Sequence, residues 1–430
     1  AKNSENGGVT NDSVVENSGT IDKRLINVNL LSAKRNVLNK SIFLKQYLNF
    51  GRKSTDTAAH NKIIPGNRLI LTSWFSDEVL KYEDTNPASG YYSNIYSDSA
   101  RTFDSIYNYK IENELAWKRV DNKKYRGIID MIGAGINVKH QLITVHQREI
   151  DTAFSNIIAG AELFNTYSNN KFWWNISGKY ALNGYNKDDY TASAAIKKNS
   201  ADSLNSLSLM IGARQQTADF IYNNYSSNHF KWNNNFTQMQ EMHAAINFSM
   251  IKFDLAVGAD FTQYSNVLYF DTAAIARQNK GSIAVISAFV KKDFVFYNWH
   301  LNNKINYQYL PDSTVIRLPE FTLEHSLYYE NNLFKGAMRL QIGASVFYTS
   351  AYYANAYMPA TAQFYLQDNK KYGDYPFINF FVNAQIKTVR IFIKIDHLNS
   401  GWMKNKSMLS PHYPMNDRAF KFGVSWRFFD

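Results

Sequence analysis

The sequence predicts an all-β protein, a transmembrane antiparallel β-barrel with about 16–18 strands in this chain, long extracellular loops and short periplasmic turns. Three observations lead to this fold class. Hydrophobic residues recur at every second position, the connections alternate between short and long, and 29 Tyr and 29 Phe accompany a mean hydropathy of -0.39. So much aromatic surface at this hydropathy requires that apolar side chains gather on one face of each strand.

Composition narrows the class of protein further. The chain has 430 residues, of which 45% are hydrophobic and 19% charged, and it contains no Cys. A disulfide-stapled fold, a thiolate metal site, an iron–sulfur cluster and a cysteine nucleophile are therefore excluded. No run of about 18 apolar residues is present, so no helical membrane span is expected.

The C-terminal stretch shows the alternation most clearly. One face carries Phe420, Phe422, Val424, Trp426 and Phe428, and the positions between them are small or charged. The same pattern recurs in the stretches 132–138, 174–182, 253–261, 338–346, 378–386 and 389–395. A soluble sandwich would need two such sheets over a shared core. Apolar faces about ten residues long that end near Tyr or Trp fit strands in a bilayer better.

The connections are expected to alternate in length, as they do in outer-membrane barrels. Short ones are predicted around Asn122–Lys124, Asn199–Asp202, Met250–Lys252, Asn331–Asn332 and Thr388. Long ones are predicted over Glu83–Arg101, Gln215–Trp232, Tyr264–Gly281, Thr349–Tyr375 and Asn399–Asp417. All eight Pro are assigned to connections or strand ends, because proline cannot donate a ladder hydrogen bond.

Two regions are expected along the chain. Residues 1–40 form a polar N-terminal segment or an extracellular loop, and residues 41–430 form the barrel. Counting from Ser41 gives about 17 strands, whereas single-chain bacterial barrels have even numbers. Either the stretch Leu25–Leu31 supplies an extra strand, or N-terminal strands lie upstream of this sequence or on another chain.

Several motifs resemble a known family. They are His412–Gly423 with its continuation to Asp430, Tyr357–Tyr365, Ile316–Glu320, Ser326–Glu330, Asn228–Asn235 and Phe43–Tyr47. Together they resemble the putative porin family of Bacteroidota outer membranes over roughly Arg24 to Asp430. The resemblance implies an outer-membrane location and a chain that corresponds to the later two-thirds of a typical member, with further strands before it. It implies no residue with an assigned role.

The inward-facing positions supply the candidate pore-lining residues. These are Lys139, Lys179, Asp254, Asp260, Lys304, Glu324, Arg339, Arg390, Lys394, Asp396, Lys421 and Arg427. Facing basic and acidic rows would set up a transverse field in a water-filled pore and decide its ion preference. The alternative is that the same residues solvate the interior and pair into a plug-like network.

No motif predicts an enzyme, and no catalytic, cofactor-binding or metal-binding residue is expected. The adjacent His325 and Ser326 point to opposite faces of a strand, so they cannot form a nucleophile–base pair. His325 falls in the lipid-facing register, which a nearby bulge would resolve. The net charge of +11 is spread along strands and turns, and this distribution argues against nucleic acid.

Two functions remain open. The first is a porin-like channel for passive diffusion of small hydrophilic solutes or ions, because the predicted interior is polar and the strand count allows an aqueous channel. The second is a non-conducting barrel that serves as a structural or docking component of an outer-membrane assembly, because long ordered loops usually carry function. Expected partners are outer-membrane lipid and lipopolysaccharide, with a surface lipoprotein or another outer-membrane or periplasmic protein in the docking case.

Overall fold

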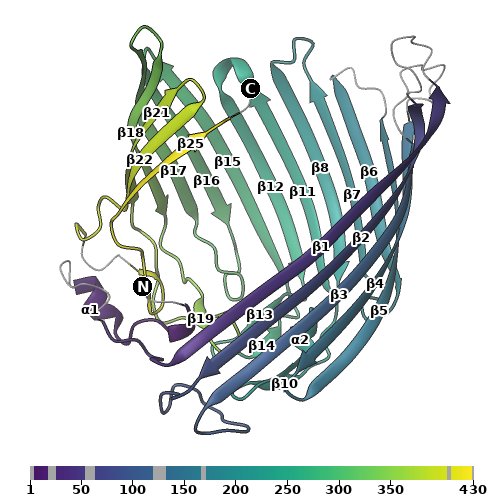
Figure 1. Cartoon of the computed structure of the whole chain (residues 1–430), viewed down its shortest axis with the longest axis vertical. Helices are drawn as coiled ribbons and strands as arrows, with labels where there is room; N and C mark the ends of the chain where they lie inside the picture. Colours follow the sequence, from purple (N-terminus) through teal and green to yellow (C-terminus); the bar gives the residue numbers. More distant parts are fainter. Residues whose placement is uncertain are drawn as a thin grey trace.

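The computed structural model describes residues 4–17, 26–53, 63–119, 132–165, 171–403 and 408–428. Its main element is one 17-stranded antiparallel sheet that curves round on itself (Figure 1). The fold class predicted from the alternation is confirmed. No helix in these ranges is long and apolar enough to cross a membrane.

The strands of this sheet follow one another along the chain as an up-and-down meander. The first eight are β1 (Ala33–Lys53), β2 (Ile63–Asp84), β3 (Thr102–Arg119), β4 (Ile132–Gln147), β5 (Ile150–Asn165), β6 (Phe172–Asn183), β7 (Tyr190–Asn199) and β8 (Asn205–Gln216). The next nine are β11 (Met239–Met250), β12 (Leu255–Ser265), β15 (Ser282–Phe296), β16 (Trp299–Tyr309), β17 (Phe321–Leu333), β18 (Met338–Thr349), β21 (Phe377–Ile386), β22 (Val389–Asp396) and β25 (Ala419–Trp426).

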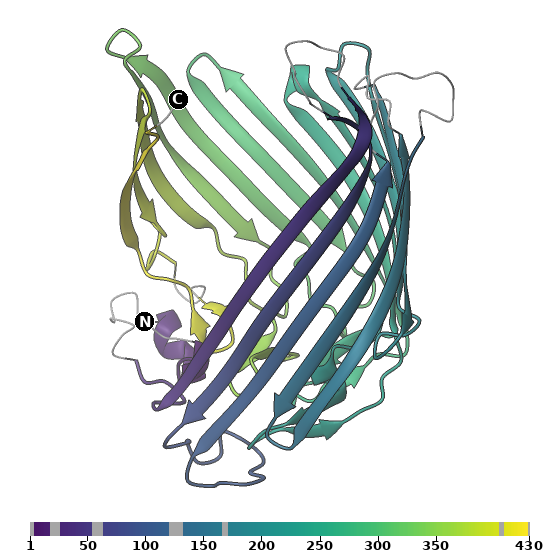
Figure 2. The ribbon, with the colours of Figure 1, turned by 45° about the vertical axis from the view of Figure 1, so that its right-hand side comes forward.

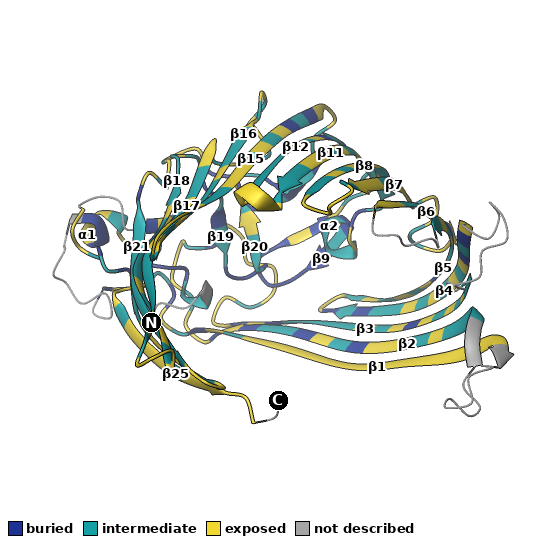
Figure 3. Ribbon diagram, turned by 90° about the horizontal axis from the view of Figure 1, so that it is seen from above, coloured by how far each residue is buried: buried dark blue, intermediate teal, exposed yellow. Residues whose placement is uncertain are grey.

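The two end strands keep one edge each without a partner. Within the described ranges β1 pairs only with β2, and β25 pairs only with β22. In Figure 3 the sheet forms an incomplete ring with these two strands at its ends. Both run from the end of the sheet with the long connections to the end with the short ones, so direct pairing between them would be parallel.

The N-terminal expectation needs correction at two points. The first strand begins at Ala33 rather than Ser41, so residues 33–40 belong to β1 and not to the polar N-terminal segment. Within Leu25–Leu31, residues 26–31 form no strand, and Leu25 lies outside the described residues. Only an isolated bridge between Val9 and Val28 is present there. An extra strand from this stretch therefore does not resolve the odd count.

The two ends of the sheet differ sharply (Figure 2). At the short-turn end the connections include 251–254, 297–298, 334–337 and 387–388; the one predicted near Asn122 lies outside the described residues. At the long-loop end the predicted loops are confirmed as 85–101, 217–238, 266–281, 350–376 and 397–418. Alternation locates most of these connections to within a few residues, but the turn predicted at Asn331–Asn332 lies within β17, and the chain turns at 334–337 instead.

The long connections carry small elements of their own. These are β9 (Asn224–Ser226) with β10 (Lys231–Asn233), β13 (Leu268–Phe270) with β14 (Ala276–Gln278), β19 (Ala356–Met358) with β20 (Gln363–Tyr365), β23 (Met408–Ser410) with β24 (Tyr413–Pro414), and α2 (Phe220–Asn223). The N-terminal segment adds η1 (Ser4–Asn6) and α1 (Asp12–Asn17). Figure 3 shows β9, α2, β19 and β20 inside the outline of the sheet.

The outer face of the sheet is apolar. On β25 the side chains of Phe420, Phe422, Val424 and Trp426 are 65%, 75%, 65% and 59% exposed, respectively. A soluble protein would cover such a face, because contiguous exposed apolar surface is otherwise confined to small patches. Here the apolar face continues from strand to strand around the ring, as lipid contact requires.

Candidate functional site

The inner face of the sheet carries paired charges. Glu112 of β3 lies 3.3 Å from the ammonium of Lys110 and 3.6 Å from that of Lys139 on β4. Gln141 of β4 also donates a hydrogen bond to Glu112. These side chains share one face because β3 and β4 pair Glu112 with Gln141 in register. One carboxylate thus balances two ammonium groups on the wall of the interior.

A second group of charges lies on the last strands. Asp396 of β22 contacts the ammonium of Lys394 at 2.6 Å and that of Lys421 on β25. In another part of the sheet, Lys304 and Glu324 are 3.3 Å apart across β16 and β17. Acidic and basic groups therefore alternate as local pairs between neighbouring strands. The basic row facing an acidic row across a pore remains a prediction.

Ten of the twelve candidate pore-lining residues lie at inward positions of the described strands. They are Lys139, Lys179, Asp260, Lys304, Glu324, Arg339, Arg390, Lys394, Asp396 and Lys421. Their role in a pore remains a prediction. Most have a polar neighbour: Arg339 lies 2.5 Å from Glu330, and Asp260 lies 2.5 Å from His243.

Two of the candidates lie elsewhere. Asp254 ends the short helix η4 (Ile251–Phe253) in a left-handed turn with φ of 45°, because β12 begins only at Leu255. Arg427 follows the last residue of β25, where its backbone N–H bonds to the carbonyl of Thr388 in the neighbouring turn. Both residues belong to the rim at the short-turn end rather than to the wall. The alternation of hydrophobic and polar residues did not reveal that these two positions lie outside the strands, because the same alternation can continue into a turn.

The long-loop end is closed over by a folded layer that the sequence did not predict. We call it the loop cap; it comprises the described parts of residues 4–32 and of loops 85–101, 217–238, 266–281, 350–376 and 397–418. One buried apolar cluster joins Leu30, Tyr92, Trp232, Phe270 and Ala360 from five of these segments. A second cluster joins Val9, Val15, Ala354, Tyr372 and Met408. The loops thus share cores of their own.

Asn228 is the main polar connection within the cap. It is 0% exposed, and its Oδ1 accepts hydrogen bonds from the Ser97 hydroxyl at 2.8 Å and the Asp98 N–H at 3.0 Å. Its Nδ2 donates to the Asp98 carbonyl at 2.8 Å, and its backbone N–H donates to Asp104 at 2.9 Å. These bonds tie loop 217–238 to loop 85–101, so the two loops cannot separate without exposing buried polar groups.

His229 completes this connection as a neutral imidazole. Burial lowers the pKa of His229, so its Nδ1–H donates to the Asn94 carbonyl at 2.9 Å and its Nε2 accepts from the Thr102 hydroxyl at 2.6 Å. The ring stacks on Tyr92 with centroids 3.9 Å apart. Tyr92 in turn lies 2.7 Å, hydroxyl to hydroxyl, from Tyr82 of β2. The cap is therefore anchored to the inner wall.

The N-terminal segment belongs to the same layer. The imidazole of His412 and the carboxylate of Asp12 are 3.2 Å apart, and the Tyr372 hydroxyl donates to Asp12 at 3.2 Å. The hydrogen bond to Asp12 raises the pKa of His412. Burial alone would raise the pKa of Asp12, but the bonds and charge of His412 hold it below its usual value. The segment thus bridges from loop 397–418 to the start of β1.

His325 stays on the outer face. The pairing of β17 with β16 and β18 runs without a shift over the described residues, so the bulge suggested for this position is wrong. The imidazole instead forms a 2.7 Å hydrogen bond with the side-chain carbonyl of Asn303 on β16. A polar group facing lipid is thereby satisfied by a neighbouring strand. Ser326 points to the opposite face.

No group of three or more His, Asp or Glu in the described ranges is arranged to hold a metal ion. A cavity with a volume of about 640 Å³ lies between the cap and the inner face of β1–β5. A second one, of about 460 Å³, lies between β18, β22 and β25 and is lined by Arg339, Arg390 and several amide side chains.

Comparison with known proteins supports the same assignment. The family model described as putative porin matches residues 1–430. No curated protein matches the sequence. Among solved structures, a variant of the ferric enterobactin receptor PfeA from Pseudomonas aeruginosa is similar in fold, with a TM-score of 0.58 at 11% identity over 91% of this chain and 67% of that one.

Two further receptors give the same result. The siderophore receptor PirA from Acinetobacter baumannii has a TM-score of 0.53 at 8% identity, covering 91% of this chain and 71% of that chain. The ferric preacinetobactin receptor BauA from the same organism has a TM-score of 0.54 at 10% identity, covering 91% and 63%. At such identities the likeness concerns the fold alone. The chain is therefore an outer-membrane β-barrel, and it belongs to the putative porin family.

Proposed function

We propose that this protein passes small hydrophilic solutes or ions by passive diffusion, with entry restricted by the loop cap. The observation that carries the proposal is the contrast between the two faces of the sheet. The outer face is apolar, whereas the inner face holds hydrogen-bonded ion pairs and amides that need water or polar solutes around them. A dry interior would leave many of these groups poorly solvated.

The cap adds selectivity to this proposal. A barrel of this width without internal structure would let solutes through with little discrimination. Here loops 85–101 and 217–238 are tied together by Asn228 and anchored to β2 through Tyr92. Solutes would have to pass around this layer or wait until it opens.

Single-channel recording tests the proposal directly. Purified protein is incorporated into a planar bilayer, and stepwise currents in KCl are the expected result. The same preparation is used in a vesicle swelling assay with sugars of increasing size. Absence of both current and swelling, from protein that retains heat-modifiable migration on gels, would rule out passive diffusion.

A docking role is the second candidate, and the exposed apolar surface of the cap favours it. Ile95, Tyr96, Phe364 and Leu409 are 54%, 51%, 59% and 64% exposed on cap loops. These loops lie at the end opposite the short turns, where a surface lipoprotein or lipopolysaccharide would meet the barrel. A partner that co-purifies in stoichiometric amount under mild detergent, and is lost in the Tyr96→Ser variant, would support docking.

A further inference from the structure

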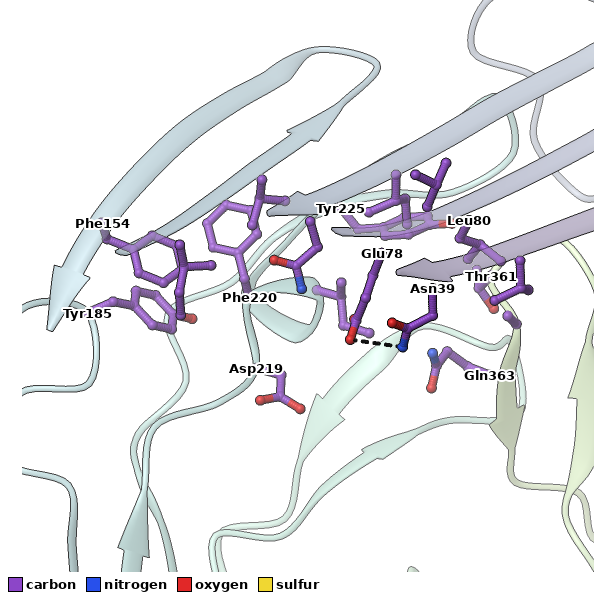
Figure 4. Close-up of a pocket in the computed structure, with 18 of the residues that line it drawn as sticks. Asn39, Glu78, Leu80, Phe154, Tyr185, Asp219, Phe220, Tyr225, Thr361 and Gln363 are labelled. Carbon is purple, nitrogen blue, oxygen red and sulfur yellow. Dashed lines mark hydrogen bonds between the residues drawn. The ribbon is translucent and has the colours of Figure 1, made fainter. Parts of the chain in front are cut away.

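The cavity between the cap and the inner face of β1–β5 combines features of a small-molecule site. Its volume of about 640 Å³ lies within the range typical of ligand pockets. One wall is the inner face of β1–β5, and the other is made by α2, β9, β10 and loop 350–376 (Figure 4). The cap therefore does more than cover the interior: it encloses a defined volume against the sheet.

Aromatic side chains form two sides of this cavity. Phe154 of β5 and Tyr185 lie with ring centroids 4.8 Å apart, and Phe220 of α2 is 6.0 Å from each. In another part of the lining, Tyr225 stacks on Trp232 at 4.6 Å. Figure 4 shows Phe154, Tyr185 and Phe220 grouped together, with Tyr225 on the far side of the opening. Such surfaces favour a ligand with a flat or bulky apolar body.

The charges that line the cavity are all negative. Glu78 of β2 and Asp219 ahead of α2 are its only charged lining residues in the described part of the chain. Glu78 is exposed, and its polar contact among the described residues is the Asn39 amide at 3.5 Å. Asp219 makes no cap bond to α2 with its side chain, and the surrounding protein raises the pKa of Asp219 by desolvation alone. Neither carboxyl has a basic partner in the lining.

Two buried polar atoms of the lining also lack a partner among the described residues. Thr361 is only 2% exposed, and its hydroxyl makes no hydrogen bond. The side-chain oxygen of Asn108 on β3 is likewise buried and unpaired. Because buried polar atoms are nearly always satisfied, such positions commonly mark where a ligand or water binds. The Asn108 amide oxygen accepts hydrogen bonds, and the Thr361 hydroxyl can accept as well as donate one, so both can bind a ligand that carries N–H donors.

We propose that this cavity binds a small molecule with an aromatic or bulky aliphatic body and a cationic amine. The apolar body lies among Phe154, Tyr185 and Phe220, and the ammonium group takes the place of the missing basic partner near Glu78 and Asp219. Anionic ligands are disfavoured by the same two carboxylates. This inference deepens the proposed function, since the cavity lies at the mouth of the proposed solute path.

The test compares two ligands that differ mainly in charge. Tryptamine and indoleacetate are titrated calorimetrically against the purified chain in nonionic detergent. Saturable binding of tryptamine, at least about tenfold tighter than that of indoleacetate, is expected because one charge contact contributes about 1.4 kcal/mol. Equal or tighter binding of indoleacetate would overturn the proposal, and so would failure of tryptamine to bind.

Variants locate the site. Asp219→Asn and Glu78→Gln should each weaken tryptamine binding several-fold, and Phe220→Ala should weaken binding of both indoles. Glu320→Gln, which removes the same charge from an exposed position outside the cavity, is the matched control. Unchanged affinity in folded Asp219→Asn and Glu78→Gln proteins would contradict the assignment. If these variants do not fold, the comparison of the two ligands on the unaltered chain still decides the question.

Binding and conduction can fail separately. If the protein binds tryptamine as expected but carries no current, the ligand site is supported and the diffusion proposal is contradicted. If the protein conducts but does not prefer the amine, the diffusion proposal is supported and the ligand site is contradicted.

Discussion

Asn228 shows how one buried amide can hold two loops together. Replacing it by Ala leaves the N–H of Asp98 and the Asp98 carbonyl without partners, which should cost about 2 kcal/mol in the local stability of the cap. Hydrogen exchange in residues 94–101 should then accelerate by roughly 30-fold. Asn235→Ala, at an exposed position of the same loop, is the control and should change nothing. Unaltered exchange in the Asn228→Ala protein would show that the apolar clusters alone hold the loops.

The pair of His412 and Asp12 makes the attachment of the N-terminal segment depend on pH. The pKa of His412 is raised above 6.5, so its contribution is fully present below pH 6.5 and is lost as the pH rises through the folded-state value. The pKa of Asp12 is lowered below 3.8, so its contribution is lost only in stronger acid. Tyr372, whose hydroxyl donates to Asp12, and the ion pair of Glu16 with Lys370 are the other ionisable groups that face this contact.

Limited proteolysis should report this dependence. Cleavage within residues 4–17 is expected to be slower at pH 5.5 than at pH 8.5, once each rate is normalised to an unstructured peptide. The Asp12→Asn protein should lose the difference, because its His412 has no carboxylate to bind. A difference that persists in Asp12→Asn would assign the pH dependence to another group.

At the scale of the elements, the sequence predicted the strands far better than the loops. The alternation on β25 or β18 follows from lipid on one side and polar surroundings on the other, and both are properties of neighbouring residues. The cap depends instead on contacts between distant segments, such as Asn228 with Asp104, which are 124 positions apart. No local period encodes such a contact. Its trace in the sequence was the motif Asn228–Asn235, whose Asn, His and Trp now have partners in the structure.

The same limit explains the errors near strand ends. Asp254 was assigned to a strand because the alternation of inward and outward positions continues through the turn. A bulge was suggested near His325 because the sequence alone does not show that Asn303, on another strand, forms a hydrogen bond with the outward-facing imidazole. The aromatic cavity was missed for a related reason: Phe154 is on β5, whereas Tyr185 and Phe220 come from two later connections.

The unpaired edges of β1 and β25 lead to a cross-linking prediction. Both strands run in the same direction, so an antiparallel ring needs an odd number of further strands between them, from upstream of this sequence or from another chain. An unpaired edge in lipid leaves backbone groups without hydrogen bonds. Cysteines at Lys45 or Asn49, each combined with Ser425→Cys, should therefore form no disulfide in membranes.

The chain suits this experiment because it contains no Cys of its own. The positive control pairs Arg390→Cys with Ser425→Cys, since those residues are direct partners across β22 and β25. Efficient oxidation of a β1–β25 pair would show that the ring closes directly and would contradict the expectation of additional strands.

For the whole molecule, the proposed diffusion function makes the charged interior and the cap act in series. Under this proposal the cap would decide which solutes enter, and the paired charges on the wall would decide which ions pass. Because Glu112 and Asp396 each contact two lysines on the wall, removing one member of such a group should change ion preference more than conductance. Glu112 is the best place to test this, since it balances both Lys110 and Lys139.

The Glu112→Gln variant should make the current more selective for anions. Lys110 and Lys139 would then lose the carboxylate that both contact, and a unit charge at about 4 Å contributes about 1 kcal/mol in water, enough for a several-fold change in relative permeability. The reversal potential in a KCl gradient measures this shift directly. Glu320→Gln removes a charge from an exposed loop position and should leave the reversal potential unchanged. Equal reversal potentials for the two variants would mean that ions do not pass along the wall formed by β3 and β4.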